Sequence, residues 1–65
     1  MSKLQNARKA AGLSQSKLAE ASGVNVRMIQ HYEQGVKDIN QAAGITLYQL
    51  ATSLNVNIED LLEIE

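Results

Sequence analysis

The sequence predicts an all-α fold, a compact bundle of five short helices. Ala, Leu, Gln, Lys and Glu, which favour helices, dominate the 65 residues, and Pro is absent. Small polar residues that suit helix N-termini alternate with Gly residues that suit helix C-termini. Apolar residues recur at helical spacing, and no segment shows the strict alternation of a surface strand.

A chain of this length provides one domain with one hydrophobic core, which we place over residues 1–65. It has no Cys and a single His, His31, so neither a disulfide nor a Cys/His metal site is available. We therefore expect no metal and no cofactor. The apolar runs are far too short for a membrane span, and no apolar leader precedes the first helix. We expect a complete, cytoplasmic protein that does not enter a membrane.

Charge is divided unevenly along the chain. Residues 1–37 carry all six Lys and Arg with two acidic residues, a balance of +4. Residues 38–65 carry five acidic residues and no Lys or Arg, a balance of −5. A polyanion responds to the local field, which salt screens over about 8–10 Å, more than to the total charge. The first half could therefore face phosphates, although small domains also split their charge by chance.

Capping residues delimit the first three expected helices. In order, the helices and their flanking residues are Ser2–Ala11 followed by Gly12, 15–22 between Ser14 and Gly23, and 26–34 between Asn25 and Gly35. Apolar side chains should face the core at helical spacing. In the first two helices these are Leu4, Ala7, Ala11, Leu18 and Ala19.

The second half begins with a less regular stretch, residues 36–44. The fourth helix then has the clearest periodicity, an apolar stripe at i, i+3, i+4 and i+7 that ends before Asn55. The stripe consists of Leu47, Leu50, Ala51 and Leu54. We expect a short fifth helix capped by Asn57, with two acidic residues in its first turn. Its apolar face would be Ile58, Leu61 and Leu62.

The third expected helix has two different faces. Steps of about 100° per residue place three apolar residues, Met28, Ile29 and Tyr32, on the inner side. Four hydrogen-bonding residues fall opposite: Arg27, Gln30, His31 and Gln34. Arg and Gln are the side chains that pair bidentately with guanine and adenine in the major groove. The same pattern also describes an ordinary solvated helix face.

Residues 15–34, QSKLAEASGVNVRMIQHYEQ, resemble the helix-turn-helix of the phage-repressor or Cro-like (XRE) regulators. That motif has a small residue in its first helix, Gly at the turn and a β-branched residue in its second helix. Ala19, Gly23 and Ile29 occupy these positions here. The resemblance extends over residues 4–63, including the segment LYQLATSLNVNIEDLLE. It implies a lambda-repressor-like domain with the helix-turn-helix at the second and third helices, and double-stranded DNA as partner.

The resemblance also implies roles for individual residues. Base-reading positions are matched by Val26, Arg27, Gln30 and His31. Phosphate-contacting positions are matched by Gln15, Asn25 and Lys37. Arg8 and Glu33 match a structural ion pair between the first helix and the end of the third. The loop after the third helix is less basic than in many relatives, because Lys37 is followed by Asp38.

Two functions remain open. The first is a transcriptional regulator, a repressor of the prokaryotic or phage type, that binds a two-fold operator as a homodimer. In that case Ile64 is the candidate dimer residue, while Ile58 and Leu61 could instead close the protein's own core. The second is a protein-binding, antitoxin-like module whose acidic last third would suit a basic partner protein. No nucleophile–base spacing or phosphate loop stands out, so we do not expect an enzyme.

Overall fold

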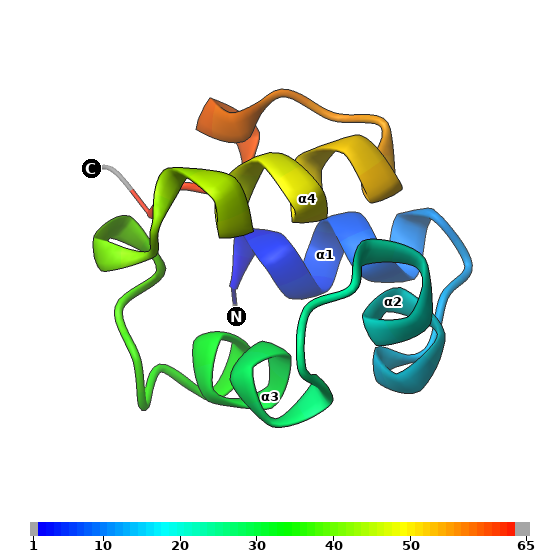
Figure 1. The fold of residues 1–65 in the computed structure, drawn as a ribbon, viewed down its shortest axis with the longest axis horizontal. Coiled ribbons are helices and arrows are strands. Elements are labelled where there is room, and N and C mark those ends of the chain that lie inside the picture. The colour runs from blue at the N-terminus through cyan, green and yellow to red at the C-terminus, as the bar shows by residue number, and fades with distance from the viewer. Residues whose placement is uncertain (1, 64–65) are drawn as a thin grey trace.

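The computed structural model describes residues 2–63, which form four α-helices and two single 3-10 turns (Figure 1). In chain order these are α1 (Lys3–Ala10), α2 (Gln15–Ser22), α3 (Val26–Gln34), η1 (Ile39–Gln41), α4 (Gly44–Leu54) and η2 (Ile58–Asp60). Among these residues there is no strand, and the all-α prediction is confirmed. In Figure 1, α3 lies at one end of the molecule and α4, covered by η2, at the other.

The bounds predicted for α2 and α3 are confirmed, because both helices have the expected caps. Ser14 Oγ accepts a hydrogen bond from the amide of Lys17, and Asn25 Oδ1 accepts one from the amide of Arg27. Gly23 and Gly35 end these helices in the left-handed conformation, with φ of 77° and 79°. Only Gly adopts this conformation without a steric penalty.

The prediction of five helices is wrong, because the expected fifth helix is only the turn η2. At its start the backbone N–H of Asn57 donates a hydrogen bond to Asp60 Oδ2 over 3.0 Å. The chain then turns so that Leu61, which is completely buried, enters the core. A single turn loses the conformational entropy of helix nucleation and gains none of the hydrogen bonds that further turns would add.

The fourth helix ends before Asn55 as predicted, but it begins inside the stretch that was expected to be irregular. α4 begins at Gly44, three residues before its apolar stripe, and Ala43 makes no side-chain cap. Within the stretch expected to be irregular, η1 forms instead, and Asp38 Oδ1 caps it by accepting from the amide of Asn40. A helix start without a capping side chain leaves no signal in the sequence.

One core joins all four helices. The buried apolar side chains are Leu4, Leu18, Val24, Ile29, Tyr32, Ile39, Leu47, Leu50, Ala51, Leu54 and Leu61. The whole stripe predicted on α4 is buried, whereas Ala11, expected to face inward, is the exposed C-cap of α1. Leu61 and the partly buried Ile58 belong to the protein's own core. Ile64, the candidate dimer residue, lies outside the described residues.

The two ends of the described chain are held together by Glu63. Its carboxylate Oε2 accepts a hydrogen bond from the backbone amide of Lys3 over 2.6 Å, at the N-terminus of α1. Its own backbone exchanges two hydrogen bonds with the side chain of Asn40 in η1, of 2.8 and 3.1 Å. Glu63 therefore links α1, η1 and the C-terminal segment.

Gly23→Ala is expected to lower the free energy of unfolding by about 1 kcal/mol, because Ala resists a positive φ. A Cβ at Gly23 would meet no atom within 4 Å, so the cost is one of backbone conformation alone. Gly44→Ala is the matched control, since Gly44 has equally open surroundings and no positive φ. We expect it to stabilise the protein by about 0.4–1 kcal/mol. Urea denaturation measures the change in the free energy of unfolding for both variants. Changes of the same sign would contradict the prediction.

Candidate nucleic-acid interface

The two faces of α3 are separated as the sequence predicts. On the inner side Ile29 is completely buried and Tyr32 is 7% exposed. On the outer side Arg27 is exposed, while Gln30 and His31 are half-buried at the base of the same face. Packing therefore fixes the helix through one side and leaves the other side to contact a ligand.

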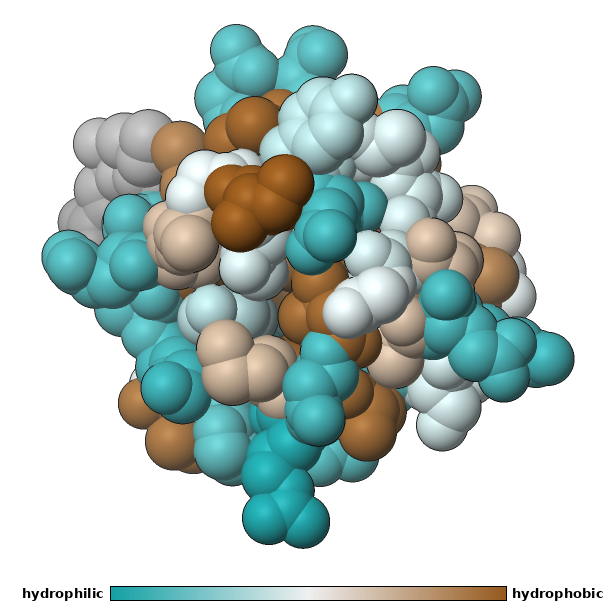
Figure 2. All heavy atoms as spheres, viewed as in Figure 1, coloured by the Kyte–Doolittle hydropathy of each residue, from teal (hydrophilic) through white to brown (hydrophobic). Residues whose placement is uncertain are grey.

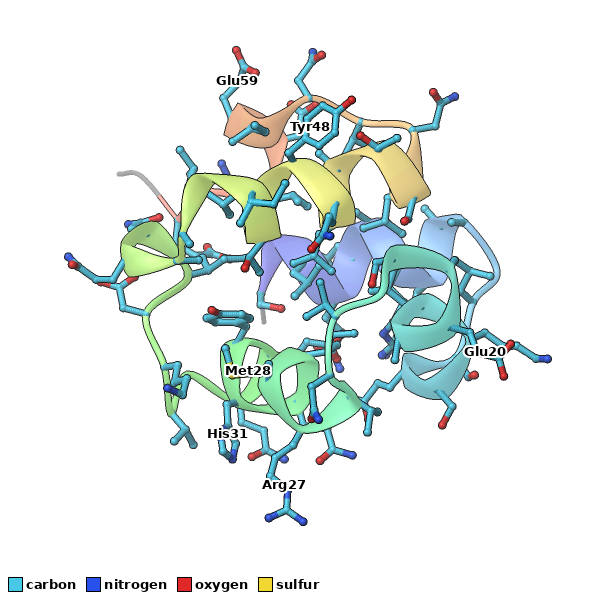
Figure 3. The ribbon with its side chains drawn as sticks, viewed as in Figure 1. Glu20, Arg27, Met28, His31, Tyr48 and Glu59 are labelled. Carbon is cyan, nitrogen blue, oxygen red and sulfur yellow. The ribbon has the colours of Figure 1, made fainter. Side chains whose placement is uncertain are left out.

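Arg27 and His31 project from α3 at the end of the molecule farthest from Tyr48 on α4 (Figure 3). The ring of His31 is only partly available, because its Nδ1 is buried and finds no hydrogen-bond partner among residues 2–63. Val26, in the first turn of α3, is half-buried beside Arg27. The structure thus places all four predicted base-reading residues on α3, with Arg27 reaching farthest into solvent.

A buried network ties α3 to the two helices before it. The guanidinium of Arg8 donates to both carboxylate oxygens of Glu33, from Nε over 2.7 Å and from a terminal nitrogen over 3.1 Å. The other terminal nitrogen donates to the carbonyl oxygen of Leu13 over 2.8 Å. Only 10% of the Arg8 side chain and 2% of the Glu33 side chain are exposed. The pair predicted between the first and third helices thus lies in contact and is shielded from water.

The hydrogen bond that Arg8 donates to Glu33 raises the pKa of Arg8, burial opposes this rise, and the negative charge of Glu33 adds to it. The guanidinium therefore stays charged at every pH that the fold meets. A guanidinium that is always charged needs a carboxylate partner when it is buried, and Glu33 provides this partner for Arg8.

Gln15 takes part in this network, which the sequence did not reveal. Its Nε2 donates to Glu33 Oε1 over 3.0 Å, from the first residue of α2 to the last turn of α3. The two residues lie 18 positions apart, so no local pattern indicates the contact. The bond fixes the direction of the Gln15 side chain at the start of α2 and leaves its second amide hydrogen for a further acceptor.

Asn25 and Lys37 flank α3 at its two ends. Asn25 is exposed, and its Oδ1 is occupied by the amide of Arg27 over 2.7 Å, which leaves the side-chain NH2 facing solvent. Lys37 is exposed in a turn that is held against the helix, because the amides of Val36 and Lys37 both donate to the carbonyl oxygen of His31. The three residues predicted to contact phosphate thus occupy the start of α2 and the two ends of α3.

Other kinds of site find little support in the part of the chain that the structure describes. Residues 2–63 hold no group of three His, Cys, Asp or Glu side chains placed to bind a metal ion. Among the helices of these residues, none has both the length and the apolar composition that crossing a bilayer requires.

Comparison with known protein families shows to which family the chain belongs. The sequence profile of the helix-turn-helix family matches residues 4–61, nearly the whole chain. The chain belongs to the helix-turn-helix family. It is a Cro/cI-like (XRE-type) DNA-binding domain of the kind found in transcriptional regulators. This helix-turn-helix domain has no match among the curated proteins or the solved structures.

The matched range contains α2 and α3, with Gly23 between them in the left-handed conformation. The helix-turn-helix family binds DNA and is typically not enzymatic.

Proposed function

We propose that this domain represses transcription by inserting α3 into the major groove of a specific DNA site. The observation that carries the proposal is the outer face of α3, where Arg27 and its polar neighbours stand opposite the buried Ile29. A helix with its side chains is about 10–12 Å across, and the major groove is about 12 Å wide. α3 can therefore enter the groove with this face against the base edges.

The side chains on α3 suit particular base edges. Arg27 pairs bidentately with guanine O6 and N7, and Gln30 with adenine N6 and N7. Val26 packs against a thymine methyl group. His31 donates through Nε2, because its buried Nδ1 cannot reach a base. These contacts would carry sequence specificity, whereas contacts to phosphate carry none.

The remaining residues fix the position of α3. Gln15, Asn25 and Lys37 bind backbone phosphates on either side of the groove. Arg8 and Glu33 set the angle between α3 and the preceding helices, and we assign them no direct contact with DNA. Of these three residues only Lys37 is charged, so non-specific affinity per copy is low and depends only weakly on salt.

Two copies would bind a two-fold operator with half-sites about 10 bp, or about 34 Å, apart. The domain measures 27 × 22 × 21 Å. Two copies therefore fit side by side on one face of the duplex with both α3 helices in successive major grooves. Pairing doubles the phosphate and base contacts without enlarging the domain.

Selection from a random duplex library at about 100 mM salt tests this proposal, since salt near that level suppresses non-specific binding. We expect enrichment of a palindrome whose half-sites lie one helical turn apart. Enrichment of a single, unrepeated half-site would contradict the dimer. A folded protein that enriches nothing would contradict sequence-specific binding altogether.

Arg27→Ala is expected to weaken binding to the selected site by about 1–3 kcal/mol and to relax the sequence preference at one position. Lys37→Ala is the matched comparison, because it removes an exposed charge that we assign to phosphate. It should weaken binding to all sequences alike and lower the slope of log K against log salt by about 0.9. Fluorescence anisotropy on selected and scrambled duplexes separates the two. Equal effects of Arg27→Ala on both duplexes would rule out base reading.

A further inference from the structure

An exposed apolar patch lies on α4, away from the helix-turn-helix. Ile45 and Tyr48 are 63% and 59% exposed, and they stand three residues apart on one face of the helix. Figure 2 shows hydrophobic atoms on the open surface over α4. We call these two side chains the α4 patch. The opposite side of α4 already supplies Leu47, Leu50 and Leu54 to the core, so the fold makes no use of the patch.

Acidic side chains border the α4 patch. η2 packs against α4, and Glu59 extends from it at the same end of the molecule as Tyr48 (Figure 3). Asp60 is also exposed. No Lys or Arg occurs anywhere in residues 38–65, so no basic residue of α4 or η2 offsets this charge. The surface therefore combines an apolar centre with a negative rim.

The α4 patch lies at the end of the molecule opposite the proposed DNA interface. In Figure 3, Tyr48 and Glu59 point away from one end while Arg27 points away from the other. A ligand on the patch would not touch DNA held by α3. Its negative rim would also be repelled by phosphate, which makes DNA itself an unsuitable occupant.

We propose that the α4 patch binds a partner protein that presents an apolar side chain flanked by Lys or Arg, while α3 remains free for DNA. Tyr is enriched among the residues that dominate binding energy at protein interfaces, and here its ring stands beside an aliphatic side chain. The acidic rim selects a basic partner by charge complementarity and accelerates its encounter. The proposal goes beyond DNA binding and does not depend on it.

A second copy of this chain fits the patch less well. A two-fold axis through the patch would bring the Glu59 side chains of both copies toward each other, and like charges at an interface disfavour association. The same axis would turn the two α3 helices in opposite directions, so that one duplex face could not accept both. A dimer on a two-fold operator needs a surface at the side of the molecule instead.

Chemical-shift titration of the 15N-labelled protein with a defined probe tests the proposal. The probe is an amphipathic helical peptide of Leu, Ala and Lys, about 18 residues or five turns long. Its matched control replaces every Lys with Glu. We expect the Lys peptide to shift the amide signals of α4 and η2, and the Glu peptide to shift none. Equal binding of both peptides, or Lys-peptide shifts confined to other elements, would overturn the proposal.

Two surface variants locate the site. Ile45→Ser and Tyr48→Ser should each weaken Lys-peptide binding by at least about tenfold, as removal of a central interface side chain does. Val36→Ser is the matched control, because Val36 is 66% exposed but lies outside the patch. It should leave the peptide affinity unchanged. Unchanged affinity in both patch variants would overturn the proposal, and their amide spectra report whether they remain folded.

Two further outcomes separate this proposal from the others. Shifts of α4 signals with protein concentration alone, without peptide, would show that a second copy occupies the patch and would overturn it. Arg27→Ala should bind the Lys peptide as the unmodified protein does. Loss of peptide binding in that variant would place the site on α3 and overturn the proposal, whereas failure to select any DNA sequence would leave it intact.

Discussion

Glu33→Gln is expected to remove most of the stability of the protein. The substitution keeps the shape of the side chain but leaves the guanidinium of Arg8 buried without a counter-charge. Breaking a buried ion pair in this way costs about 3 kcal/mol or more. A domain of this size without disulfides or metal has only about 3–5 kcal/mol in total. Urea denaturation followed by circular dichroism should therefore find the unfolding midpoint shifted to a very low urea concentration.

Two controls identify the cause of that loss. Glu20→Gln breaks the contact of 3.8 Å with Lys17, where both side chains are largely exposed, and should change stability by less than about 0.5 kcal/mol. The double variant Arg8→Met with Glu33→Leu removes both charges together and should be more stable than Glu33→Gln. If Glu33→Gln unfolds at the same urea concentration as Glu20→Gln, the network does not stabilise the fold.

The pH dependence of this network follows from the direction of the Arg8 shift. The pKa of Arg8 is raised in the folded protein by its hydrogen bond to Glu33. A raised pKa means that the stabilisation is complete below the ordinary pKa of Arg and is lost only as the pH rises through the higher folded value. That window lies far above neutrality, so Arg8 contributes no change in stability between mildly acid and mildly alkaline solutions.

Ile29→Ala is expected to cost about 2–5 kcal/mol, because Ile29 is completely buried on α3 and the smaller side chain leaves a cavity. Ile29→Val removes one methylene and should cost about 0.5–1.5 kcal/mol. Ile45→Ala is the control on an exposed site, with an effect within about 0.5 kcal/mol. Urea midpoints should fall in that order. A similar cost for Ile29→Ala and Ile45→Ala would show that α3 does not depend on its inner side.

Local patterns determine α2 and α3, and these were predictable. A capping side chain and a Gly bound each helix, as with Ser14 and Gly23, and both signals act within four residues along the chain. The buried stripe of α4 was predictable for a similar reason, since its periodicity depends only on neighbouring turns. The family resemblance then predicted a helix-turn-helix domain, and the match over residues 4–61 confirms that the chain belongs to this family.

Features that depend on distant residues were not predictable. Gln15 meets Glu33, and Asn40 meets Glu63, through single hydrogen bonds that span 18 and 23 residues. Neither contact has a periodic or compositional signature. The expected fifth helix ends after the single turn η2, although the contact between Asn57 and Asp60 forms at its start. The roles of the residues on the outer face of α3 stay predictions, since they depend on the geometry of bound DNA.

The contact between Lys3 and Glu63 closes the described chain into a ring. The two residues are 60 positions apart, yet an amide nitrogen of one lies 2.6 Å from a carboxylate oxygen of the other. A covalent link across a loop of about that length removes about 4 kcal/mol of conformational entropy from the unfolded chain. A covalent cross-link between residues 3 and 63 would therefore roughly double the stability of this protein without altering any residue of α3.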